Sequence, residues 1–179
     1  WQLCGYENPN YTNVAYPFPY DPPFVPDKNP MGVYRRNFHV SDTKRETYIV
    51  FEGVSSCMEL FVNDKYVGYS QGSHLQAEFN ISDFVKEGEN TVLVKVRKWC
   101  SGSYLEDQDF FRFNGIFRDV YILSRPKGHI KDIKITTEGD TNYAGIRAAC
   151  FTKVDDPAAT PTPTEPPLES AKFSDFSFQ

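Results

Sequence analysis

The residues whose types are best suited to catalysis or ligand binding form a run of acidic side chains between aromatic residues. In "SYLEDQDFFR" (103–112), three carboxylates, Glu106, Asp107 and Asp109, lie within four residues. Neighbouring carboxyl groups can act as acid and base in catalysis. Crowding like charges among apolar rings costs energy unless a cation, a hydrogen-bond donor or a ligand offsets it. Taken alone, the run fits a solvated acidic turn better than a catalytic cluster, because charge runs usually lie on wet surface.

The four cysteines give no metal signature. Cys4, Cys57, Cys100 and Cys150 are scattered, and the sequence has no C-x-x-C pair. Zinc sites need closer and more regular ligand spacing. We therefore predict free thiols.

Composition limits the classes of partner. The chain has 19 basic and 24 acidic residues, a net charge of −5, and no Lys/Arg stripe. Nucleic acid and anionic membrane are therefore not expected as partners. No apolar run approaches the roughly 18 residues of a membrane span. The start at Trp1 reads as the interior of a longer sequence, so the compartment stays open between cytoplasm and periplasm.

The elements that must position the acids are short strands. Aromatic residues make up 16% of the chain, and strand-like runs rich in β-branched and aromatic residues recur every 8–12 residues or so. A turn at "NDK" predicts a hairpin, and 82–90 reads as a connection with one helical turn. This pattern predicts an all-β protein, a β-sandwich or jelly roll. The expected strands are 33–40, 47–54, 58–63, 66–70, 77–81, 91–99 and 118–124.

A proline-rich segment precedes the first of these strands. Residues 9–30 hold seven prolines, which remove backbone donors and fix φ. We expect an extended arm over the surface, with its aromatic side chains packed on the sandwich or presented to a ligand. A disordered linker is the alternative, but linkers seldom carry so many aromatics.

The pattern restarts after Arg125. Residues 129–138 and 145–154 alternate as two strands, which cannot enclose a core alone. "DDPAATPTPTEPPLES" then reads as a flexible or polyproline-like linker. The predicted organisation is a first domain at 1–124, the opening hairpin of a second at 125–154, and a Pro/Thr-rich tail at 155–179.

Several motifs together carry a resemblance to a known family. They are "YTNVAYPF" (11–18), "VGYSQGSHLQAEFNIS" (67–82) and "SYLEDQDFFRFNGIFRDV" (103–120). In order and spacing they resemble the N-terminal sugar-binding domain of family-2 glycoside hydrolases of β-galactosidase type, over nearly all of 1–124. The next segment resembles the start of that family's immunoglobulin-like domain.

The resemblance implies a jelly-roll domain beside a catalytic (β/α)8 barrel. Retaining glycosidases use two carboxyl groups about 5–5.5 Å apart, and in this family both glutamates lie on the barrel. No catalytic residue is therefore expected in this chain, and the chain alone is expected to be inactive. Glu106 and Asp109 are not the catalytic pair.

The resemblance also implies which residues reach the sugar. Asn13, with Val14 beside it, matches the asparagine that hydrogen-bonds the galactosyl ring. Asp109 matches the aspartate that contacts sugar hydroxyls and a sodium ion. An ionised carboxylate accepts two hydroxyl hydrogens and an amide both donates and accepts, so the pair can distinguish hydroxyl arrangements. The alternatives are an Asx turn at Asn13 and a buried salt bridge from Asp109 to Arg112 or Arg118.

The other two acids are expected to hold the loop. Glu106 and Asp107 would accept backbone N–H groups or pair with Arg112 and Arg118, so that Asp109 is presented at a fixed angle. Of the aromatic residues beside them, most are expected in the core or in contacts between domains, although they could include a sugar-stacking platform.

Magnesium is implied for the parent enzyme, but elsewhere than in this chain. Gln71 matches a residue that helps bind an additional magnesium ion in some relatives. Ser101 stands where those relatives have an acidic ligand. A serine offers no charge to a hard cation that favours carboxylate oxygens, which places that second metal site in doubt.

These residues are expected to belong to the sugar-binding domain of a retaining β-galactosidase and to contribute to its galactosyl subsite. The implied partners are a β-galactoside such as lactose, the catalytic barrel of the same parent chain, and copies of that parent in a homo-oligomer. The alternatives are another family-2 activity, β-glucuronidase or β-mannosidase, and a free-standing carbohydrate-binding module or lectin. The "YTN" and "LEDQD" loops count against the former, and the "TPTPTEPP" linker mildly favours the latter.

Overall fold

The structure is a computed structural model that describes residues 2–13, 15–106, 109–137 and 146–153, with the backbone alone for 2, 132–137 and 146–153. Two compact units are present, Trp1–Arg125 and Pro126–Gln179. Over the described ranges the helices are short 3-10 turns, and none has the length and apolar character of a membrane span. These turns are η1 (Gln2–Cys4), η2 (Ser82–Phe84) and η3 (Ser101–Leu105).

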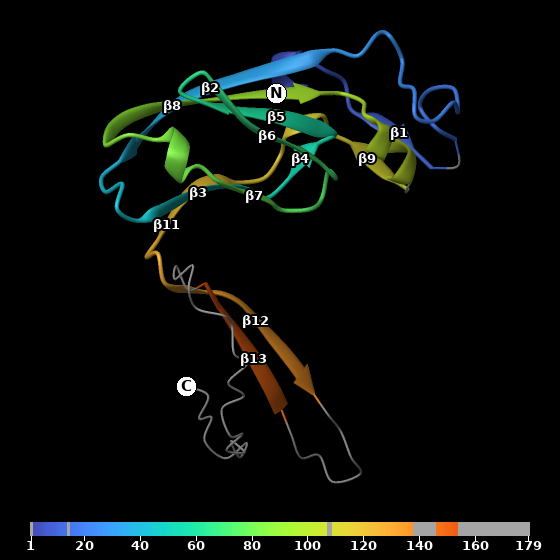
Figure 1. Cartoon of the computed structure of the whole chain (residues 1–179). Coiled ribbons are helices and arrows are strands. Elements are labelled where there is room, and N and C mark those ends of the chain that lie inside the picture. Colours follow the sequence, from blue (N-terminus) through green and yellow to red (C-terminus); the bar gives the residue numbers. More distant parts are fainter. Residues whose placement is uncertain (1, 14, 107–108, 138–145, 154–179) are drawn as a thin grey trace, which may run out of the picture. The chain divides into compact units, whose positions relative to one another are not determined.

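Two antiparallel sheets form the layers of the first unit (Figure 1). The four-stranded sheet has the order β2 (Met31–Val40), β8 (Gly88–Arg97), β5 (Cys57–Val62), β6 (Lys65–Gln71). The three-stranded sheet has the order β11 (Val120–Arg125), β3 (Glu46–Phe51), β7 (Ala77–Asn80). This arrangement is a β-sandwich, which confirms the predicted all-β class.

The core lies between the two sheets. Its side chains come from inward positions of both layers, and Val62, Leu60 and Ile81 are completely buried. Strand β5 buries alternate residues most deeply, as a strand with one face on a core must. The cluster comprises Ile49, Phe51, Val54, Met58, Leu60, Val62, Ile81, Val94 and Val96.

The hairpin between β5 and β6 has the predicted turn. Asn63 and Asp64 have φ values of 50° and 63°, the left-handed conformation that Asn and Asp tolerate and that two-residue hairpin turns require. The Asn63 side chain also donates to Asn90 Oδ1 at 2.8 Å and accepts from the backbone N–H of Thr91 at 3.0 Å. These bonds attach the turn to β8.

Two short strand pairs extend the sandwich. Strand β4 (Val54–Ser55) pairs with β10 (Gly115–Ile116), so the strand expected over 47–54 is in fact two. Strand β1 (Asn10–Thr12) pairs with β9 (Phe110–Arg112). These last two lie side by side at one end of the unit (Figure 1).

The proline arm packs on the sandwich, as expected. Phe18 is 9% exposed and meets Trp99 and Tyr104 edge-on, with ring centroids 5.0 and 5.2 Å apart. The Tyr104 hydroxyl donates to the carbonyl of Phe24 at 2.5 Å and accepts from the N–H of Asp21 at 3.2 Å. The arm is therefore held in two ways. Phe18 packs in a second small core, and backbone groups of the arm hydrogen-bond to the Tyr104 hydroxyl.

Replacing Tyr104 by phenylalanine should destabilise the arm. The change keeps the ring and leaves the Phe24 carbonyl and the Asp21 N–H without their partner, at a cost of about 1–2 kcal/mol. Urea unfolding of the chain measures the loss, and limited proteolysis of the arm should speed up with it. Tyr20→Phe is the matched control, because Tyr20 is 68% exposed. Equal stability of the two variants would contradict this account.

The second unit contains the two predicted strands as an antiparallel pair, β12 (His129–Thr137) and β13 (Ile146–Lys153). The register shifts between Ile130 and Asp132. Its assignment as the start of an immunoglobulin-like domain stays a prediction. The predicted tail at 155–179 lies outside the described residues.

Candidate functional site

The short β1–β9 ribbon brings the two candidate sugar ligands to one place. Its antiparallel register pairs Thr12 with Phe110. Asn13 follows Thr12 and Asp109 precedes Phe110, so both residues leave the ribbon at the same end. Asn13 and Asp109 are exposed. Residues from the proline arm and from the acidic run therefore form one exposed polar site.

Tyr11 joins this pair. Its hydroxyl donates a hydrogen bond to Oδ1 of Asp109 and also interacts with the side chain of Asn13. The pKa of Tyr11 is raised, chiefly because its O–H donates to the Asp109 carboxylate, with loss of hydration and the repulsion between two anions adding to the effect. Tyr11 therefore remains a hydrogen-bond donor at neutral pH.

The aromatic ring of Tyr11 packs against a neighbouring ring at a tilt. The centroids of Tyr11 and Phe111 are 5.2 Å apart, at an interplanar angle of 56°. Both side chains are more than half exposed, and Phe113 is 46% exposed beside them. The polar site is thus bordered by an uncovered aromatic surface. Tyr104, another aromatic residue beside the acids, is buried in the small core with Phe18 and Trp99.

Glu106 holds the loop through Ser73. Its Oε1 accepts the backbone N–H of Ser73 at 2.6 Å, and its Oε2 accepts the Ser73 hydroxyl at 2.7 Å. Ser73 is 2% exposed and its hydroxyl also lies 3.2 Å from that of Ser55. A carboxylate held twice by a buried residue fixes the point at which the acidic run leaves η3.

Arg112 connects the arm to the same loop. It is 3% exposed, its Nε donates to the Thr12 hydroxyl at 3.2 Å, and a terminal nitrogen donates to the backbone carbonyl of Glu106. The guanidinium also lies 5.5 Å from the centre of the Phe110 ring. One buried side chain therefore joins β1, β9 and the acidic run.

Arg118 has a different environment. Its Nη1 donates to the carbonyls of Glu52 at 3.3 Å and His74 at 3.2 Å. Among the described residues, its hydrogen bonds go to these two carbonyls and not to the carboxylates of Glu106 or Asp109. Arg118 therefore supports the segments that lead into β4 and into β7. Val14 and Asp107 lie outside the described residues.

The residues matching the additional magnesium site do not gather ligands. The Gln71 side chain accepts from the Tyr69 hydroxyl at 3.1 Å and packs against Gly102 in η3. Ser101 is exposed. Across the parts of the chain with described side chains, no group of three or more His, Cys, Asp or Glu could hold a metal ion. Gln71 has a structural contact here.

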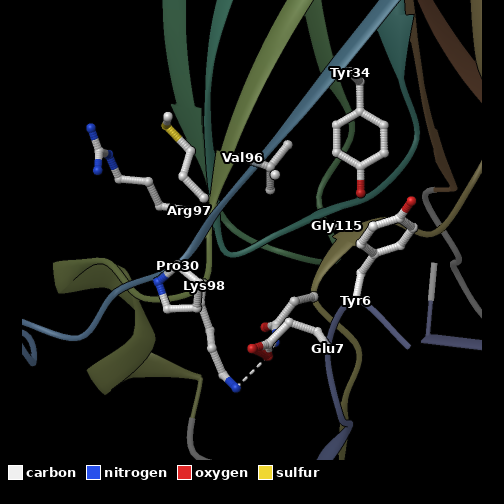
Figure 2. A pocket seen from close by; sticks show the side chains of 11 residues that line it. Tyr6, Glu7, Pro30, Tyr34, Val96, Arg97, Lys98 and Gly115 are labelled. Atoms are coloured by element: carbon white, nitrogen blue, oxygen red, sulfur yellow. Dashed lines mark hydrogen bonds and ion pairs between the residues drawn. The ribbon is translucent and has the colours of Figure 1, made fainter. Parts of the chain in front are cut away.

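A cavity of about 160 Å³ lies elsewhere on the first unit (Figure 2). Tyr6, Tyr34 and the start of β2 line it, and in the view the rings of Tyr6 and Tyr34 point toward each other. Below them the Glu7 carboxylate accepts from Lys98 at 2.5 Å and from the Asn114 side chain at 3.1 Å. These bonds fasten the N-terminal segment to the residue after β8 and to the connection between β9 and β10.

A two-sheet β-sandwich with exposed rings and convergent hydroxyl, amide and carboxylate groups at one end is typical of carbohydrate-binding domains. The sequence matches the model of the glycosyl hydrolases family 2, sugar binding domain, over residues 1–126. The chain belongs to this family, as the motifs indicated.

Similar full-length proteins give the context. The chain is 50% identical over 140 residues to a β-galactosidase of Actinobacillus pleuropneumoniae, which covers 78% of the chain and 14% of that protein. It is 46% identical over 164 residues to a β-galactosidase of Erwinia tasmaniensis, covering 89% and 16%. The chain therefore spans about a seventh of the length of these relatives.

Solved structures show the same fold. A β-glucuronidase of an uncultured Clostridium sp. superposes with a TM-score of 0.59 at 24% identity, over 70% of this chain and 24% of that one. An FMN-binding β-glucuronidase of Facaelibacterium prausnitzii gives 0.63 at 21% identity, over 70% and 22%. At these identities the likeness concerns the fold alone.

Proposed function

We propose that this chain is the sugar-binding domain of a retaining β-galactosidase, in which Asn13 and Asp109 contribute to the subsite for the terminal galactose. Relatives named β-galactosidase at 46–50% identity support the activity. The observation that carries the site is the β1–β9 register, which places Asn13, Tyr11 and Asp109 at one exposed end.

The chemistry of the three side chains suits sugar hydroxyls. Tyr11 donates to Oδ1 of Asp109, and among the described residues Oδ2 makes no hydrogen bond. An oxygen of this kind accepts a hydroxyl hydrogen, while the amide of Asn13 offers a donor and an acceptor. Val14, next to Asn13, would be the second residue of the arm that lines the subsite.

The bond from Tyr11 sets the orientation of the carboxylate before a sugar arrives. Pre-orientation lowers the entropic cost of binding. It also leaves Oδ2 of Asp109 as the acceptor for a sugar hydroxyl. An epimer whose hydroxyl points elsewhere leaves Oδ2 without a hydrogen bond and binds more weakly.

Sodium fits the same carboxylate as a proposed ligand. Asp109 is exposed and its Oδ2 is open toward solvent among the described residues. A monovalent cation there would balance the anion and join sugar oxygens to it. Its remaining oxygen ligands would come from outside this chain. Glu106 and Arg112 would hold the loop, Asp107 would assist them, and Arg118 would support the adjoining segment.

Hydrolysis itself needs the parent enzyme. We propose that two glutamates on a barrel of the same parent chain perform it, that the natural substrate is a β-galactoside such as lactose, and that magnesium binds elsewhere in that parent. The exposed rings of Tyr11, Phe111 and Phe113 suit contact with that barrel, and the parent is proposed to form a homo-oligomer.

The decisive experiment reads the gene beyond the codon for Gln179 and assays the complete product. Aryl β-galactoside hydrolysis, with none by the chain alone, is the expected result. Preference for a β-glucuronide or β-mannoside would overturn the β-galactosidase assignment. A stop codon or an unrelated module, with micromolar galactoside binding by the chain alone, would make it a free-standing binding module.

Replacing Asn13 by alanine in that enzyme should weaken sugar binding. One hydrogen bond is worth about 0.5–1.5 kcal/mol, so we expect KM, and the Ki of galactose, to rise about two- to tenfold, with a smaller fall in kcat. Asn37→Ala is the control, since Asn37 is an exposed amide on β2. Unchanged KM and kcat would show that the arm does not reach the sugar.

A further inference from the structure

The cavity beside the N-terminal segment has room for a small molecule. Its volume of about 160 Å³ holds on the order of ten water molecules, or about as many non-hydrogen atoms as one hexose has. Its walls include the rings of Tyr6 and Tyr34, which point toward each other (Figure 2), and the backbone of Gly32 and Gly115. Aromatic walls with a few polar groups are typical of small-molecule sites.

The polar groups of the cavity centre on an ion pair. Oε2 of Glu7 accepts from Lys98 Nζ at 2.5 Å and from the Asn114 amide at 3.1 Å. The side chains of Glu7 and Lys98 are only 19% and 14% exposed. Among the described residues, Oε1 of Glu7 makes no hydrogen bond, and the Lys98 ammonium, which has three N–H donors, uses one. A mostly buried acceptor and mostly buried donors are thus left for a molecule in the cavity.

The charge of this floor selects among ligands. Glu7 and Lys98 balance each other, so a charged ligand would lose hydration without meeting a net opposite charge. Arg97, at the rim, already lies 3.9 Å from Glu59. A neutral molecule with several hydroxyls can donate to Oε1 of Glu7 and accept from Lys98 at the same time. The C–H groups of its ring would pack against the tyrosine rings.

We propose that this cavity binds one neutral sugar unit, a hexose or a simple hexoside, as a second sugar site of the domain. Glu7 and Lys98 bond its hydroxyls, and Tyr6 and Tyr34 hold its ring. Glu7 precedes β1 and Asn114 follows β9, whereas Asp109 lies at the other end of the β1–β9 ribbon. A sugar can therefore bind in the cavity whether or not Asp109 contacts galactose.

Titration of the whole isotope-labelled chain with methyl β-galactoside or methyl β-glucoside tests the proposal by NMR. The backbone amide signals of Gly32, Asn114 and Gly115 should shift saturably, with a Kd in the millimolar range for so small a ligand. The same shifts should appear in Asp109→Asn, which removes the other proposed sugar ligand. Methyl glucuronide, which carries a carboxylate, should bind at least about tenfold more weakly. Equal binding of the glucuronide, shifts confined to Asn13 and its neighbours, or no saturable shift would overturn the proposal.

Tyr6→Ala tests the wall of the cavity. Tyr6 is 67% exposed, so the variant should keep its fold, and loss of the ring should weaken binding of the neutral sugars about tenfold. Tyr66→Ala is the matched control, because Tyr66 is 56% exposed on β6 and does not line the cavity. Equal affinities of the two variants would contradict the site.

Glu7→Gln tests the floor. The change keeps the size of the side chain and leaves Lys98 without its anion, so the floor gains a positive charge. Methyl glucuronide should then bind more tightly than it does to the wild type, and the preference for the neutral sugars should shrink about tenfold. An unchanged preference would show that the Glu7–Lys98 pair does not face the ligand, and would overturn the proposal.

Discussion

Replacing Asp109 by asparagine in the full-length enzyme is expected to lower kcat/KM for a β-galactoside by about 10²–10³-fold, or roughly 3–4 kcal/mol of transition-state stabilisation. The residue lies on an exposed loop end and carries no part of the core. The thermal stability of the variant should therefore remain close to that of the wild type. Steady-state kinetics with an aryl galactoside measure the effect.

The physical reason lies in the number of acceptors. Asp109 uses Oδ1 for the Tyr11 hydroxyl, so Oδ2 is the acceptor left for a sugar or a cation. An asparagine that keeps the Tyr11 bond turns an NH₂ group toward the sugar, where it donates and carries no charge. The sugar hydroxyl then loses its partner, and a proposed sodium ion loses its anion.

The Tyr11 pKa provides an independent check that the Asp109 carboxylate accepts the Tyr11 hydroxyl in the wild type. In the wild type the pKa of Tyr11 is raised because the O–H donates to the carboxylate. In Asp109→Asn this cause disappears, so the pKa should fall toward its ordinary value, and one tyrosine should ionise earlier in an ultraviolet titration above pH 10.

The control is Asp64→Asn. Asp64 lies in the β5–β6 turn at φ 63°, which asparagine also tolerates, so neither kinetics nor stability should change. Tyr11→Phe should fall between the two, since it frees the carboxylate without removing it. Near-normal kinetics for Asp109→Asn would remove Asp109 from the sugar subsite.

The larger strands could be predicted because each is several residues long and carries β-branched or aromatic residues. The continuous run at 47–54, however, does not form one strand. The strand ends at Phe51 because its register against the segment 115–125 shifts by one residue: Phe51 pairs with Val120, whereas Val54 pairs with Ile116. Such a register shift depends on residues more than sixty positions away.

The ribbon that forms the site could not be predicted from local pattern. Strands β1 and β9 have three residues each, one within a proline-rich arm and one after an acidic run, and neither shows alternation. Family motifs pointed to Asn13 and Asp109 but gave no role to Tyr11. That role comes from the register, because only the pairing of Thr12 with Phe110 brings a tyrosine of the arm to Asp109.

The two arginines illustrate the same limit. Arg112 and Arg118 were expected to pair with the acidic run, and their spacing gives no reason to separate them. Arg112 is buried and donates to the Glu106 carbonyl, whereas Arg118 donates to the carbonyls of Glu52 and His74. Arg112, in β9, contacts the acidic run, whereas Arg118, after β10, contacts the segments that lead into β4 and β7.

Glu106→Ala should then destabilise the domain by about 2–4 kcal/mol and reduce activity without touching the sugar. The two hydrogen bonds from Ser73 to its carboxylate, at 2.6 and 2.7 Å, are charge-assisted, and hydrogen bonds to charged groups contribute about 1.5–3 kcal/mol each. Their loss also leaves a buried backbone N–H unpaired. Urea unfolding of the chain measures the first effect.

The kinetic effect of Glu106 should differ from that of Asp109, because Glu106 is a positioning residue. Loosening the loop lowers the fraction of enzyme with Asp109 in place, so KM and kcat should both worsen, by about tenfold in kcat/KM. Glu106→Gln should recover most of the activity, since an amide can accept the Ser73 N–H and donate to the Ser73 oxygen. Ser73→Ala, which removes one of the two bonds, should be intermediate in stability. If Glu106→Ala unfolded as the wild type does, or Glu106→Gln were as impaired as Glu106→Ala, the loop would have to be held by other groups.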